Sequence, residues 1–132
     1  VPRVGEKRAL AIPFVQIEQY PAAMTMLDIA IAPAGRGGFF RGKSDLRWLE
    51  ASALKIPLVA DPVVYPDITH GVDGFHVHHK GDVATWVGRL VENPELRSEV
   101  GERAYEYVMA HRTMNVACYQ WVAAFEQILK HS

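Results

Sequence analysis

Residues 43–60, which read KSDLRWLEASALKIPLVA, join a helical pattern to the pattern of a short buried strand. Within residues 44–55 the apolar side chains recur at the spacing of one helix face, and Ser44 can cap the start of that helix. Residues 56–60 are almost continuously apolar, as strands covered on both faces tend to be. A helix followed directly by such a strand is half of the repeating unit of α/β folds.

Three other short apolar runs lie on either side of this stretch. They span residues 10–15, 27–32 and 74–78, and Pro, Gly or Asp bounds them. Residues 19–26 and 44–55 can connect the first three strands as right-handed crossover helices. The sequence therefore predicts an α/β fold, a partial Rossmann-like three-layer domain with a parallel sheet of about four strands.

Three helices are predicted after residue 78. Asp82 can cap the first, and the Asn-Pro pair at 93–94 can end it. A second helix follows from Glu95, and a third is capped by Thr113. The third carries Cys118 and several aromatic residues on an apolar stripe, which we expect to be core rather than ligands. The apolar stripe of the first consists of Val83, Trp86, Val87, Leu90 and Val91.

Composition limits the classes of protein to which the chain can belong. Its 132 residues indicate a single domain at 1–132, and 49% hydrophobic residues can fill a core. The net charge of -1 argues against nucleic-acid binding. The apolar runs are far shorter than the roughly 20 residues of a membrane span, so no transmembrane segment is expected.

A sheet of about four strands would leave an unpaired apolar edge. We therefore expect the domain to be truncated, with further strands upstream in a longer protein or a homodimer partner covering this edge.

The lone Cys118 cannot form an internal disulfide, which indicates a reducing compartment. The expected location is cytoplasmic, with peripheral membrane association of the full-length protein left open.

A glycine-rich basic loop, PAGRGGFFRGK, follows the second predicted strand at residues 33–43. In an open parallel sheet, ligands bind beyond the carboxyl ends of the strands, where this loop lies. Glycines let backbone amides approach a ligand, and cations and a helix N-terminus attract anions. The pattern fits a phosphate site and, equally, a surface loop with Ser44 as an ordinary N-cap. The residues concerned are Gly35, Gly37, Gly38, Gly42, Arg36, Arg41 and Lys43.

Glu50 lies at the margin of the apolar stripe of helix 44–55, where a carboxylate needs a partner. Two interpretations remain open. It can form a salt bridge with Arg47 or another cation, or it can accept hydrogen bonds from ribose hydroxyls, as acidic residues do in dinucleotide sites.

Six stretches occur in an informative order: DIAIAP at 28–33, residues 43–60, GVDGFHV at 71–77, NPELR at 93–97, AYEYV at 104–108 and HRT at 111–113. Together they resemble the second half of the C-terminal nucleotide-sugar-binding domain of family 4 (group 1) glycosyltransferases, which have the GT-B fold. The resemblance covers nearly the whole chain from about residue 10, and the combination is more specific than any single piece.

This resemblance implies retaining transfer of a sugar from a nucleoside diphosphate sugar to an unknown acceptor. It also implies that Glu50 binds the ribose, that residues 15–19 line the base pocket and that residues 61–65 face the donor sugar or phosphates. The nucleotide-sugar donor is expected as a partner, with no metal or other cofactor. The implied diphosphate site consists of Arg41, Gly42 and the backbone amides of Lys43, Ser44 and Asp45.

The chain departs from the family in three ways. Gly42 occupies the position of the first of two glutamates that the family has eight residues apart, of which Glu50 is the second. An earlier Arg and Lys that neutralise the diphosphate are not found. The N-terminal acceptor domain is also absent, so we expect this chain alone to be catalytically inactive.

Other functions are less well supported. His76 and His78 would share one side of a strand, but no carboxylate or Cys at a suitable spacing completes a metal site. No Gly-x-Ser-x-Gly sequence indicates a hydrolase, and a receiver-like or flavodoxin-like domain lacks its characteristic residues. The main alternative is a non-catalytic α/β binding or scaffolding module that has lost its donor contacts, which Gly42 favours.

Overall fold

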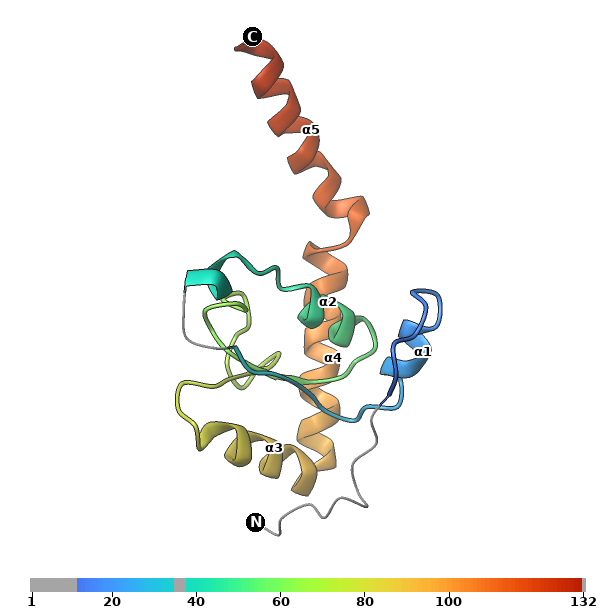
Figure 1. Ribbon diagram of the computed structural model, residues 1–132, viewed down its shortest axis with the longest axis vertical. Coiled ribbons are helices and arrows are strands. Elements are labelled where there is room, and N and C mark those ends of the chain that lie inside the picture. The colour runs from blue at the N-terminus through green and yellow to red at the C-terminus, as the bar shows by residue number, and fades with distance from the viewer. Residues whose placement is uncertain (1–11, 35–37, 132) are drawn as a thin grey trace.

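The computed structural model describes residues 12–34 and 38–131, which form a three-layer α/β fold (Figure 1). Its sheet has three parallel strands in the order β1 (Ala30–Ala32), β2 (Leu58–Ala60) and β3 (Phe75–His76). Ala30 pairs with Leu58, and Val59 pairs with Phe75. The α/β class and the parallel sheet are confirmed.

The predicted first strand is wrong in the part that can be assessed. Residues 12–15 lie in no strand, and residues 10 and 11 fall outside the described part of the chain. The short helix α1 (Tyr20–Met24) follows and leads to β1. The described residues thus form three strands rather than four, because an apolar run forms a strand only where a neighbour can pair with its backbone.

Helices cover both faces of the sheet. On one face, α2 (Leu46–Ala53) packs the fully buried Trp48 and Ala51 against Leu58. On the other face, α3 (Asp82–Glu92) places Leu90 against Val59. The long helix α4 (Pro94–His111) contacts both α2 and α3, so it joins the two layers.

Helix α2 ends in a Schellman motif, which fixes the turn into β2. The amide of Ile56 donates to the carbonyl of Ala51, and the amide of Lys55 donates to that of Ser52. Lys55 takes the left-handed conformation, φ 58°, where glycine is more usual. Its carbonyl packs directly on Gly101 of α4, where a side chain would clash with it.

The caps of the C-terminal helices differ in part from the prediction. Asn93 ends α3 and caps α4, because its side chain accepts from the amide of Leu96 at 2.9 Å. Asp82 is the first residue of α3 rather than its cap. Its carboxylate accepts from the amides of His78 and His79, both at 2.8 Å, and these bonds lower its pKa.

The last helix, α5 (Met114–Lys130), extends away from the body of the domain (Figure 1). Thr113 occupies its N-cap position without a side-chain capping bond. The expectation that its aromatic residues are buried is wrong: Trp121 is 64% exposed and Phe125 is 60% exposed. Cys118, closer to the body, is partly buried. A helical apolar stripe predicts that a face needs cover, but not that this chain supplies it.

Candidate anion pocket at the start of helix α2

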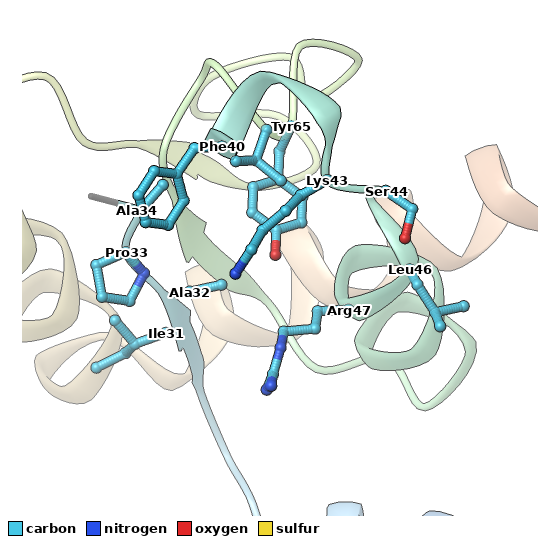
Figure 2. Close-up of a pocket in the computed structure, with 11 residues that line it drawn as sticks. Ile31, Ala32, Pro33, Ala34, Phe40, Lys43, Ser44, Leu46, Arg47 and Tyr65 are labelled. Carbon is cyan, nitrogen blue, oxygen red and sulfur yellow. The ribbon is translucent and has the colours of Figure 1, made fainter. Parts of the chain in front are cut away.

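A pocket of about 410 Å³ opens at the carboxyl ends of β1 and β2, beside the start of α2 (Figure 2). This is the edge of the sheet where the glycine-rich loop was predicted to bind a ligand. The pocket combines an apolar floor with cationic and hydroxyl groups. Its lining residues are Ile31, Ala32, Pro33, Ala34, Phe40, Lys43, Ser44, Leu46, Arg47, Val64 and Tyr65.

Two cations reach this pocket. Figure 2 shows the Lys43 amine turned towards its middle, with Arg47 reaching in from α2. Lys43 Nζ lies 5.0 Å from the ring centre of Phe40 and 5.6 Å from that of Phe39, within the range of cation–π contacts. Neither cation pairs with a carboxylate of a described residue. Both charges are therefore available to an anionic ligand.

The N-terminus of α2 adds unpaired backbone donors. The amides of Ser44, Asp45, Leu46 and Arg47 donate to no acceptor in the described part of the chain. The Lys43 amide, by contrast, donates to the carbonyl of Phe40 at 3.3 Å. Of the three amides expected to hold a diphosphate, those of Ser44 and Asp45 are thus free, whereas that of Lys43 is engaged.

Tyr65 forms the far wall of the pocket, and its hydroxyl points inwards (Figure 2). It is 5% exposed, and burial raises the pKa of its phenol despite the opposing influence of Arg47. The hydroxyl therefore remains a neutral donor at physiological pH.

Glu50 is not among the residues that line this pocket. Its carboxylate accepts a hydrogen bond of 3.2 Å from the hydroxyl of Tyr20 in α1. Burial, followed by the charge of Glu50, raises the pKa of Tyr20. The salt bridge considered between Glu50 and Arg47 is not formed.

Arg41 and Gly42 lie in the short 3-10 helix η2 (Gly38–Gly42), which the sequence predicted only as loop. Both are exposed, and neither lines the pocket. A Cβ atom on Gly42 would meet no atom within 4 Å. Gly35, Arg36 and Gly37 fall outside the described residues.

The other regions expected to contact a donor are split between three cavities. Val15 lines an apolar pocket of about 330 Å³ beside α1, with Tyr20 and Leu27. Tyr65, at the end of the predicted segment 61–65, lines the anion pocket instead. Asp61 lines a third cavity, of about 730 Å³, together with His78.

The histidines shape the loop that carries Tyr65. His70 Nδ1 accepts from the amide of His76 at 3.0 Å, and His76 Nε2 lies 3.0 Å from the carbonyl oxygen of Tyr65. Burial, then the neighbouring His76 and His78, lowers the pKa of His70. No group of three potential metal ligands occurs within residues 12–34 and 38–131.

Sequence reasoning did not assign Arg47 to the site. Arg47 was considered only as a partner of Glu50, although its place in the first turn of a helix after a phosphate-type loop was an available signal. Tyr65 was included only through the resemblance, as the last residue of segment 61–65. It had no local signal of its own, because its place in the pocket depends on how the loop after β2 folds back.

Comparison with known proteins identifies the fold. No protein-family profile and no curated protein sequence matches the chain. A solved structure does match: the C-terminal domain of a group 1 family glycosyl transferase (LpcC) from Francisella tularensis, with a TM-score of 0.67 and 24% sequence identity. The match covers 78% of this chain and 53% of that one, so this chain spans about half of that structure.

The chain therefore has the Rossmann-like α/β fold of that glycosyl transferase C-terminal domain. Its pocket lies at the strand edge where such α/β folds bind ligands. Separately, none of the helices that the structure describes is long and apolar enough to cross a bilayer.

Proposed function

We propose that this chain is the donor-binding part of a retaining glycosyltransferase and that its pocket takes the diphosphate of a nucleoside diphosphate sugar. The observation that carries the proposal is that Lys43 and Arg47 line one pocket together with Ser44, whose amide is free, while the free amide of Asp45 follows directly in the chain. Cations and helix N-terminal amides are the donors that phosphate groups prefer.

The remaining donor contacts are those that the resemblance implies, from residues beside the pocket rather than in its lining. Glu50 binds the ribose, held in orientation by the hydroxyl of Tyr20. Arg41, exposed at the end of η2, adds long-range attraction for the diphosphate, and Gly42 leaves space beside it. Transfer to the acceptor requires a second domain, so the chain alone binds the donor without turning it over.

Isothermal titration with UDP, GDP and their sugars tests this function. We expect saturable binding, and we expect Lys43→Glu or Arg47→Glu to weaken it by about tenfold or more, because each removes a charge-assisted contact and adds repulsion. Arg103→Glu is the matched control, since Arg103 lies on α4, outside the pocket, and forms an ion pair with Glu99. Equal losses in all three variants would contradict the assignment.

The alternative is a non-catalytic α/β binding or scaffolding module. It is favoured by one observation: the Glu50 carboxylate is already bonded to Tyr20 and does not line the pocket. Absence of donor binding by a full-length protein that includes this chain would support the module and reject donor binding.

A further inference from the structure

Two segments that lie far apart in the chain form the polar part of the anion pocket. Residues 43–47, at the start of α2, supply two cations and a hydroxyl group, whereas Tyr65 comes from the loop after β2. Each segment also carries an aspartate that does not line the pocket, Asp45 in the first and Asp67 in the second. The width of the pocket therefore depends on how the two segments are held relative to one another.

A single guanidinium joins these two segments. Arg112, at the end of α4, places Nη2 2.7 Å from Asp45 Oδ2 and Nη1 2.7 Å from Asp67 Oδ2. Because the planar guanidinium holds its nitrogens in a fixed geometry, it fixes the separation of two carboxylates that it binds at once. The Arg112 and Asp45 side chains are 27% and 18% exposed, so their ion pair is better shielded from solvent than a surface pair is.

The start of α2 is otherwise tied mainly to its own neighbours in the chain. The backbone carbonyl of Asp45 accepts hydrogen bonds from Trp48 and Leu49 of the same helix. The polar and cation–π contacts of Lys43 with described residues are made to η2, which directly precedes it. Within the described part of the chain, the ion pair with Arg112 is thus the polar contact by which residues 43–45 reach a distant segment.

We propose that Arg112 is a positioning residue that sets the separation between the start of α2 and the loop that carries Tyr65, so that the Tyr65 hydroxyl and the cations of residues 43–47 contact one anion together. The ligand in this inference rests on the proposed function, whereas the positioning is a property of the free protein. Arg112 does not line the pocket, so it acts through the segments that it holds.

The Asp67→Asn variant tests this role by the sign of its effect on pyrophosphate affinity. Charge alone predicts tighter binding, because the variant removes a negative charge near an anion site. Positioning predicts the reverse, because the loop loses its ion pair with Arg112. We expect pyrophosphate to bind about threefold more weakly, as measured by calorimetry. Tighter or unchanged binding would overturn the proposal.

The matched control for this measurement is Glu99→Gln. It also removes a carboxylate from an exposed ion pair with an arginine, but on α4 and outside the pocket. We expect it to leave pyrophosphate affinity unchanged. A loss as large as that of Asp67→Asn would show that any weakened ion pair has this effect, and would overturn the proposal.

A comparison in the Tyr65→Phe background separates positioning from a general loss of stability. Once the Tyr65 hydroxyl is absent, Asp67→Asn should have little further effect on pyrophosphate affinity, because both changes act on the same contact. Arg112→Gln should weaken binding at least as much as Asp67→Asn. Arg112→Lys should recover part of that loss, because an ammonium can still pair with one carboxylate. Equal losses from Asp67→Asn in both backgrounds would overturn the proposal.

Amide hydrogen exchange in the free protein tests the positioning without any ligand. The Ile68 amide donates to the Tyr65 carbonyl at 3.4 Å, so its exchange rate reports on this loop. In Asp67→Asn and in Arg112→Gln we expect this amide to exchange about threefold faster, while Ala104 within α4 keeps its wild-type rate. Unchanged exchange at Ile68, or equal acceleration at Ala104, would overturn the proposal.

These two kinds of measurement distinguish failure of the inference from failure of the proposed function. If the wild type binds neither pyrophosphate nor a nucleotide, the proposed function fails, and the exchange rates still decide whether Arg112 holds the loop. Because the Asp67 side chain is 49% exposed, Asp67→Asn decides the matter even if Arg112→Gln folds poorly.

Discussion

The hydroxyl of Tyr20 donates a 3.2 Å hydrogen bond to Glu50 and thereby joins α1 to α2. If Glu50 binds a ribose, its loss should affect nucleotides but not pyrophosphate. We expect Glu50→Ala to weaken UDP or GDP binding by about tenfold and to leave pyrophosphate binding unchanged, as measured by calorimetry.

The Tyr20→Phe substitution is a milder test of the same contact. It removes one donor and leaves the carboxylate in place, so nucleotide affinity should fall by less than in Glu50→Ala. An equal fall in pyrophosphate affinity in either variant would show that Glu50 acts on the fold of α2 rather than on ribose.

A substitution at Gly42 is expected to increase the affinity for the donor sugar. A side chain there meets no atom within 4 Å, and the backbone does not require glycine. Gly42→Glu should therefore fold normally, and it restores the first glutamate of the resembled family. We expect tighter binding of a nucleoside diphosphate sugar relative to the corresponding nucleoside diphosphate. An unchanged ratio would argue against a sugar contact at this position.

Gly101 sets the distance between α4 and the end of α2. A Cβ atom would collide with the carbonyl of Lys55, which the Schellman motif holds in place. Gly101→Ala should lower the free energy of unfolding by about 1–3 kcal/mol, measured by urea denaturation. Gly88→Ala is the control: Gly88 lies within α3 with open space around it, so a gain of about 0.5–1 kcal/mol is expected. Similar effects at both positions would refute the close packing.

Protonation of His70 should make the stability of the domain depend on pH. The pKa of His70 lies below the ordinary value of 6.5, mainly through burial, and its Nδ1 must be unprotonated to accept from the His76 amide. In the folded state His70 therefore binds a proton less readily than in the unfolded state. The contribution of neutral His70 to the stability of the fold is complete above pH 6.5 and is lost as the pH falls through the folded-state pKa.

Thermal melts between about pH 7.5 and pH 5.5 check this sign. The wild type should lose more thermal stability over that interval than His70→Asn, whose amide oxygen can accept the same bond at any pH. A larger loss in the variant would contradict the assigned state of His70.

The sequence was informative where local pattern and packing agree. The buried run at β2 and the stripe of α3 predicted elements that the structure confirms, because each has a partner within the chain. Residues 12–15 and α5 carry the same kind of pattern without such a partner. Their apolar content therefore predicted a strand and a buried helix that these residues do not form.

The site was predictable to a similar degree. Lys43 and Ser44 follow from a basic loop that leads into a helix, and both line the pocket. The place of Tyr65 in the pocket was implied only by the resemblance, because it depends on contacts between segments far apart in the chain, which no local spacing encodes. The engaged amide of Lys43 likewise depends on η2 forming within the loop.

A backbone NMR titration with UDP or GDP tests donor binding most directly. Saturable shifts should be largest at the amides of Ser44, Asp45 and Arg47, and they should disappear in Lys43→Glu but persist in Arg103→Glu. Saturable shifts centred away from the start of α2, or none at all in a folded protein, would contradict the assignment of this pocket to a nucleoside diphosphate.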